Sequence, residues 1–164
     1  MADFRIWSRT VKADATIPME HVFDGWGCTG RNVSPELEWS GAPAGTKSFA
    51  LTVYDPDAPT GSGFWHWQIF NIPASASKLE AGAGDPKAGK APKGSVQGRN
   101  DYSNVGYGGP CPPPGHGPHR YVFTVFALKV DRLDLDASAS AAAIGFNLNT
   151  NVIATASFTA RFGR

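Results

Sequence analysis

Long apolar segments are missing from this sequence. No run of residues approaches the ~18 apolar residues that a membrane-spanning helix needs. Residues 1–6 also lack the apolar core of a secretion signal. The sequence therefore predicts a protein without an integral membrane segment, and we expect it to be cytoplasmic.

An excess of charge of one sign is missing as well. The formal net charge is +1 and the sequence pI is about 7.8. No basic stripe with interleaved aromatic residues occurs, although such a surface is typical of proteins that bind the phosphate backbone of nucleic acids. We expect no nucleic-acid partner.

Cysteine is scarce, with Cys28 and Cys111 as its only two positions. Their spacing matches no zinc motif, so no metal site is predicted from them. The pair could form one disulfide, but a cytoplasmic protein usually keeps its cysteines reduced, and we expect two thiols. Cys111 lies in a loop with backbone donors and near His119. A redox-sensitive thiol is therefore one hypothesis for it, beside the plainer interpretation of a packed loop cysteine.

Aromatic and β-branched residues are plentiful and concentrate in short runs. The chain of 164 residues, of which 41% are hydrophobic, is long enough for one domain with a proper core, and we expect a single domain over residues 1–164. Strands are predicted at 49–54, 64–72, 121–128 and 152–162, with shorter extended pieces at 4–8, 21–23 and 37–39. A glycine-rich turn is expected at 24–30 and a long surface loop at 74–98.

One helix is predicted, in the alanine-rich segment 134–148, with Asp134 or Asp136 as its N-terminal cap. Short strands separated by turn signals, with a single late helix, are typical of an all-β domain. The sequence therefore predicts a mainly-β fold: an antiparallel β-sandwich of two sheets with one short C-terminal helix.

The segment 108–121 combines prolines, which fix φ, with glycines, which permit positive φ. We expect a stiff loop that holds His119 and Tyr121 at the mouth of the strand that follows. Loops with function are often set on rigid scaffolds in this way, although stiffness alone would also explain the composition.

Two further polar positions adjoin predicted strands. Asp55 and Asp57 follow the strand 49–54 and are held by neighbouring prolines, and His66 lies within the strand 64–72 between two tryptophans. Taken alone, an Asp-Pro turn and a core histidine would explain them. Together with His119 and Tyr121 they favour one convergent polar pocket.

This pocket is suited to a phosphate monoester. Histidine N–H groups and the loop amides of Gly109 and Cys111 are expected to point at an anion, as in a backbone nest. Arg120 should lie on the opposite face of its strand, where a carboxylate could pair with it. The predicted ligand-binding residues are Asp55, Asp57, His66, Gly109, Cys111, His119 and Tyr121.

The motifs at 55–59, 65–67 and 109–121, together with 28–35 and 99–102, resemble the phosphatidylethanolamine-binding proteins, also called Raf kinase inhibitor-like proteins, in their bacterial and archaeal branch. The resemblance covers nearly the whole chain. It implies a β-sandwich with a small pocket for phosphate, phosphoethanolamine-like headgroups or acetate, and a cis peptide between Ala58 and Pro59. Bacterial relatives suggest a homodimer. Two departures are Cys111, where eukaryotic members tend to have glycine, and the missing counterpart of the C-terminal segment that lines the pocket in animal members.

These observations favour non-catalytic binding of a small anionic ligand. A kinase or protease is a possible protein partner, whose activity the protein would modulate. The alternative is a hydrolase in which His66 or His119 acts as general acid or base beside an aspartate. No serine-triad signature supports a nucleophile. Two histidines and two aspartates could also ligate a metal, but we expect neither a metal nor a cofactor.

Overall fold

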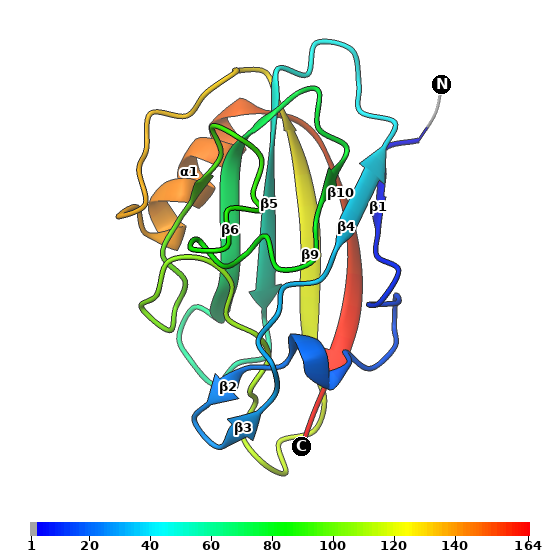
Figure 1. The fold of residues 1–164 in the computed structure, drawn as a ribbon, viewed down its shortest axis with the longest axis vertical. Coiled ribbons are helices and arrows are strands. Elements are labelled where there is room, and N and C mark those ends of the chain that lie inside the picture. Colours follow the sequence, from blue (N-terminus) through cyan, green and yellow to red (C-terminus); the bar gives the residue numbers. More distant parts are fainter. Residues whose placement is uncertain (1–2) are drawn as a thin grey trace.

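A central antiparallel sheet of five strands, in the order β10-β9-β5-β6-β8, forms the middle of the molecule (Figure 1). The structure is a computed structural model and describes residues 3–164. Its strands are β1 (Arg5–Trp7), β2 (Asp24–Gly25), β3 (Cys28–Thr29), β4 (Leu37–Ser40), β5 (Ser48–Asp55), β6 (Phe64–Pro73), β7 (Lys78–Leu79), β8 (Val96–Gln97), β9 (His119–Leu128) and β10 (Val152–Phe162). A 3₁₀ turn (Met19–His21) and one helix, α1 (Ala141–Asn151), complete the elements.

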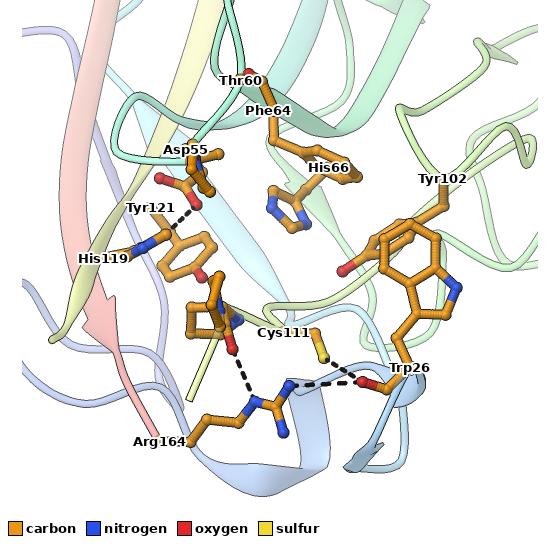
Figure 2. Close-up of a pocket in the computed structure, with 14 residues that line it drawn as sticks. Trp26, Asp55, Thr60, Phe64, His66, Tyr102, Cys111, His119, Tyr121 and Arg164 are labelled. Carbon is orange, nitrogen blue, oxygen red and sulfur yellow. Dashed lines mark hydrogen bonds and ion pairs between the residues drawn. The ribbon is translucent and has the colours of Figure 1, made fainter. Parts of the chain in front are cut away.

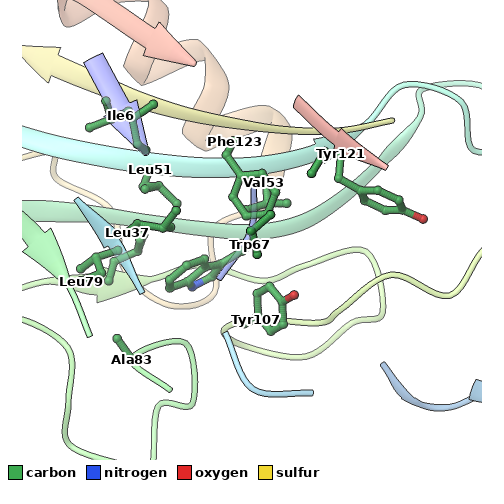
Figure 3. Close-up of a cluster of buried hydrophobic side chains, with 14 of the residues drawn as sticks. Ile6, Leu37, Leu51, Val53, Trp67, Leu79, Ala83, Tyr107, Tyr121 and Phe123 are labelled. Atoms are coloured by element: carbon green, nitrogen blue, oxygen red, sulfur yellow. The ribbon is translucent and has the colours of Figure 1, made fainter. Parts of the chain in front are cut away.

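The main core lies between the central sheet and a smaller antiparallel sheet of order β1-β4-β7. Alternate residues of β9 from His119 to Ala127 are buried, because successive side chains of a strand point to opposite faces. Figure 3 shows Leu51, Val53 and Phe123 of the central sheet beside Leu37 and Leu79 of the smaller one. The predicted mainly-β antiparallel architecture with one short C-terminal helix is confirmed.

The helix covers the other face of the central sheet. Ile144 and Leu148 of α1 pack in a second apolar cluster with Phe70 and Leu128 of the sheet. The helix begins at Ala141, later than predicted, and neither predicted aspartate caps it.

The cap is Ser140, whose Oγ accepts a hydrogen bond from the amide of Ala143. Asp136 instead accepts hydrogen bonds from Ser138, because a short acidic side chain readily closes a local turn. Residues 134–140 therefore belong to the loop that precedes the helix.

The N-terminal part differs in detail from the prediction. The extended piece expected at 21–23 is the end of the 3₁₀ turn, and the turn expected at 24–30 contains the two-residue hairpin of β2 and β3. The long excursion 74–98 holds only the short strands β7 and β8. Within residues 3–164, no helix combines the length and hydropathy needed to cross a membrane.

Cys28 and Cys111 form a disulfide, with their Cα atoms 5.9 Å apart. The expectation of two thiols, and with it the redox-sensitive thiol at Cys111, is wrong for this structure. The pairing was hidden by a separation of 83 residues along the chain. Tertiary contacts bring the segments together, because the amide of Phe23 donates to the carbonyl of Pro110 over 3.0 Å.

Candidate functional site

A cavity of about 310 Å³ opens at one end of the central sheet. At this end β5 finishes and its two antiparallel neighbours, β6 and β9, begin, so their terminal residues meet. Figure 2 shows the side chains that face the space. The lining residues are Trp26, Asp55, Ala58, Pro59, Thr60, Phe64, His66, Tyr102, Cys111, Pro112, Pro113, His119, Tyr121 and Arg164.

Asp55 and His119 form a buried pair on one wall. The Oδ2 atom of Asp55 accepts a hydrogen bond from Nδ1 of His119 over 2.6 Å, and its Oδ1 accepts from the amide of Asp57 over 2.8 Å. Both oxygens of the carboxylate are therefore engaged within the protein. A buried charge needs such partners, because desolvation is costly.

The other ring nitrogen of His119 is also occupied. Its Nε2 lies 2.6 Å from Nδ1 of His116, an exposed residue three positions earlier in the stiff loop. In this hydrogen bond one of the two ring nitrogens donates and the other accepts. The three side chains form one chain of hydrogen bonds from the buried carboxylate to the surface. His116 was not among the predicted site residues.

His66 stands on the facing wall, and its Nδ1 donates to the carbonyl oxygen of Gly108 over 2.7 Å. Burial lowers the pKa of His66 from 6.5 to about 4, against the opposing effect of that hydrogen bond and of Asp55. The imidazole is therefore neutral at pH 7. The hydrogen bond of Nδ1 to Gly108 is the one that the His66 side chain makes within residues 3–164, while the nearby backbone of Gly109 also acts to raise the pKa of the ring.

Tyr121 contributes the clearest sign of a ligand. Its side chain is 1% exposed, yet its hydroxyl has no hydrogen-bond partner in the described part of the chain. Buried hydroxyl groups are normally satisfied, and Tyr121 is among the residues that line the cavity, so a bound molecule there is a suitable partner for this hydroxyl. Burial, and then the charge of Asp55, raises the pKa of Tyr121, which keeps the phenol protonated.

An aromatic wall closes another side. Tyr102 stacks on Phe23 with ring centroids 3.9 Å apart and meets Trp26 edge-on at 4.8 Å. The Tyr102 hydroxyl donates to the carbonyl of Gly109 over 2.7 Å, and burial raises its pKa. Trp26 itself is 67% exposed, so a large aromatic surface stands at the rim of the cavity.

Arg164 supplies the cation of the rim (Figure 2). Its Nε donates to the carbonyl of Pro112 over 2.7 Å, and its terminal nitrogens lie 3.4 and 3.5 Å from the carbonyls of Gly27 and Trp26. A guanidinium has five N–H donors, so it can still meet a ligand. Arg164 thus lines the cavity, whereas its neighbours Phe162 and Gly163 do not.

The structure brings together Asp55, His66, Cys111, His119 and Tyr121 of the predicted set. Trp26, Tyr102 and Arg164 were missed as site residues. Tyr102 lies in the motif 99–102, which offered a signal, whereas nothing in the local sequence marks Trp26 or Arg164.

Two predicted site residues do not line the cavity. The Asp57 carboxylate turns away and binds Arg120 through two side-chain hydrogen bonds of 2.8 and 3.0 Å. This places Arg120 as expected, opposite the pocket face, and it lowers the pKa of Asp57 to about 2.

The amide of Gly109, expected to face an anion, donates to Oδ1 of Asn32 over 2.7 Å. Gly109 is needed for close packing, since a Cβ there would lie 2.1 Å from the carbonyl oxygen of His21. The peptide between Ala58 and Pro59 is trans, as are all peptide bonds of the described residues, so the expected cis bond is wrong. The trans form is the more stable isomer, and the hydrogen bond from the Asp57 amide to Asp55 closes the turn locally.

The sequence and the fold of this chain are similar to those of known proteins. A family model described as phosphatidylethanolamine-binding protein matches residues 7–163. The YbcL protein of Escherichia coli (strain K12) is 52% identical over 158 residues, which cover 96% of this chain and 86% of the relative. Its crystal structure superposes with a TM-score of 0.97 at 51% identity over 99% of each chain.

More distant structures share the fold. A phosphatidylethanolamine-binding protein homologue from Chlamydia trachomatis has a TM-score of 0.82 at 28% identity, over 100% of this chain and 99% of that one. A carboxypeptidase Y inhibitor in complex with its cognate proteinase has a TM-score of 0.53 at 19% identity, over 98% of this chain and 82% of that one. The second likeness concerns the fold alone.

Proposed function

Because this chain belongs to the phosphatidylethanolamine-binding protein family, in the branch of the bacterial YbcL and YbhB proteins, we propose that it binds small anionic ligands in the cavity at the end of the central sheet. The ligands are of the phosphate or phosphoethanolamine kind. The binding is non-catalytic.

The observation that carries this proposal is the unpaired hydroxyl of Tyr121 in a space also lined by His66 and Arg164. A buried donor without a partner costs free energy, which an oxyanion in the cavity recovers by accepting its hydrogen bond. Arg164 adds a positive charge at the rim, and a guanidinium matches the geometry of a phosphate group.

Catalysis through a covalent intermediate is poorly supported by the hydroxyl groups that line the cavity. Thr60 donates to the carbonyl of Gly63 over 2.5 Å, and Tyr102 donates to Gly109. The raised pKa values of Tyr102 and Tyr121 oppose formation of a phenolate at neutral pH. Activated nucleophiles need the opposite change.

The hydrolase alternative is favoured by one observation, the short contact between Asp55 and His119. A carboxylate that orients an imidazole is the usual arrangement of a general base. Turnover of p-nitrophenyl phosphate by the wild-type protein that disappears in a His119→Ala variant would favour this alternative over binding.

A protein partner such as a kinase or protease stays a prediction, because the likeness to the carboxypeptidase Y inhibitor extends to the fold alone. The homodimer expected from bacterial relatives also stays a prediction. Neither is needed for the pocket to bind a small anion.

The binding proposal is tested by titration with phosphoethanolamine, followed by tryptophan fluorescence. Trp26 is the suitable reporter, because it lines the cavity, whereas Trp67 is fully buried in the main core. We expect a saturable change that is absent in a Trp26→Phe variant, in which calorimetry still detects binding. No fluorescence change and no heat with wild-type protein at millimolar ligand would contradict the proposal.

A further inference from the structure

We infer that the cavity selects oxyanions that carry a single negative charge and still retain a proton, such as the monoanion of a phosphomonoester, and that His66 recognises this proton. The inference rests on the proposed function, since it specifies which anions the site accepts. It reverses the sequence-based expectation that both histidines donate to the ligand.

The hydrogen bond of His66 fixes its tautomer. A carbonyl oxygen can only accept, so the nitrogen 2.7 Å from the oxygen of Gly108 must carry the proton. In the neutral ring, Nε2 then has a lone pair and no proton. The His66 ring projects into the cavity (Figure 2), so the site presents a hydrogen-bond acceptor where an anion would require a donor.

The surroundings keep the ring neutral. His66 is 3% exposed and is packed edge-on against Tyr102 and Tyr121, with the ring of Phe64 4.9 Å away. The charged groups that act on it are Asp55 and Asp101, and their attraction for a proton is outweighed by the loss of solvation on burial.

His119 does not supply the missing donor. Its Nδ1 is engaged with Asp55 and its Nε2 with His116. Asp55 itself adds a carboxyl group to the same wall, and both of its oxygens are already engaged by His119 and the amide of Asp57.

A proton-bearing monoanion satisfies all of these groups at once. Its O–H donates to Nε2 of His66, and one of its charged oxygens accepts from the hydroxyl of Tyr121. A second charged oxygen is available to Arg164. A sulfate ester of the same shape and charge has no proton, so its oxygen lone pairs would face the lone pair of His66.

The test compares methyl phosphate with methyl sulfate at pH 5.5 by calorimetry. A phosphomonoester has its second pKa at about 6, so at this pH most of the methyl phosphate carries one charge and one proton. Methyl sulfate has the same charge and nearly the same shape without the proton. We expect methyl phosphate to bind at least tenfold more tightly, and its affinity to fall as the pH rises from 6 to 8 while that of methyl sulfate stays constant.

Equal affinities for the two esters would overturn this inference and leave the proposed function intact. Failure of both esters and of phosphoethanolamine to bind would overturn the proposed function as well. The two failures are therefore distinguishable.

A His66→Gln variant provides the second test, because a glutamine amide can rotate to donate or to accept. The preference for methyl phosphate should shrink towards equal binding. The matched control is His21→Gln, since His21 is equally buried and makes the same kind of Nδ1 hydrogen bond, 2.7 Å to Val33, away from the cavity. The control should keep the preference, and its loss in the control variant would contradict the assignment to His66.

Should the His66 variant fail to fold, nitrogen-15 NMR of the wild-type imidazoles at pH 6 answers the same question. We expect a protonated Nδ1 and an unprotonated Nε2 for His66. A proton on Nε2 would overturn the inference.

Discussion

The Nδ1 atom of His119 lies 2.6 Å from Oδ2 of Asp55, and only 3% and 4% of the two side chains are exposed. The pair joins the start of β9 to the end of β5, two neighbouring strands of the central sheet. It thus fixes one wall of the cavity by a contact between residues 64 positions apart.

Removing the carboxylate should destabilise the fold. Asp55→Ala leaves His119 and the amide of Asp57 without their acceptor, and breaking a buried pair in this way costs about 3 kcal/mol. Asp55→Asn keeps one acceptor oxygen and should cost about half of that. Urea unfolding at pH 7 measures both, and equal losses in the two variants would contradict the role assigned to the carboxylate.

His66 should make the stability of the protein depend on pH below neutrality. Its pKa is lowered to about 4 in the folded state against 6.5 in the unfolded chain, so the unfolded state binds more protons between these values. The free energy of unfolding therefore falls as the pH drops through this window, by at most about 1.4 kcal/mol per pH unit for one proton. A His66→Phe variant should show a smaller slope between pH 6.5 and 4.5, and an unchanged slope would contradict the burial of a neutral ring.

Asp57 should make the free energy of unfolding depend on pH in a lower range than His66 does. Arg120 lowers its pKa from 3.8 to about 2, so this contribution is fully present above pH 5 and is lost as the pH falls from about 4 to 2. An Arg120→Gln variant should be less stable than wild type above pH 5 and similar to it near pH 2. Both side chains are partly exposed, so 1 M salt should reduce the difference, and a salt-independent difference would contradict an ionic origin.

Reduction of the disulfide should lower stability markedly. The bond joins residues 83 positions apart, and for a loop of this length the chain-entropy account gives about 4.5 kcal/mol. We expect a Cys28→Ser/Cys111→Ser double variant and the reduced wild type to lose similar amounts in urea unfolding. A loss below about 1 kcal/mol would mean that the noncovalent contacts alone hold the two segments together.

The disulfide also bears on where the protein acts. Such bonds persist in oxidising compartments and are rare in the cytosol of most organisms. The cytoplasmic location stays a prediction. In an oxidising compartment, acid-quenched samples from the native host should instead show both cysteines protected from alkylation. Alkylation of both cysteines in such samples would support the cytoplasmic expectation instead.

Gly109 should tolerate no side chain. A Cβ at this position would lie 2.1 Å from the carbonyl oxygen of His21, a contact that only backbone movement can relieve. We expect Gly109→Ala to lower the thermal midpoint strongly, with a loss of about 3 kcal/mol. The control is Gly145→Ala in α1, where the space is open and alanine should add up to about 1 kcal/mol.

The strands of the central sheet could be predicted because their signals are local. The aromatic and β-branched runs of β5, β6 and β9 specify strands wherever they stand, and Asp55, His66 and His119 lie at or near the ends of those strands. The convergence of these side chains follows from antiparallel pairing. The residues at the base of the cavity could therefore be predicted from the sequence.

The rim of the cavity could not be predicted from the sequence, because its contacts are made between distant segments. Trp26 belongs to a hairpin of only two residues per strand, and Arg164 reaches it from the far end of the chain. Local patterns do not encode such contacts. The hydrogen-bond partners of the two histidines could not be predicted either. Gly108 binds Nδ1 of His66, and His116 binds Nε2 of His119, and both contacts depend on the folded structure.

The exposed position of His116 has one more consequence. Through it, the interior carboxylate of Asp55 is linked to bulk water without passing through the cavity. The exposed loop is thereby joined to one wall of the cavity, so a substitution at His116 would change the hydrogen bonding of the Asp55–His119 pair although His116 itself does not line the space.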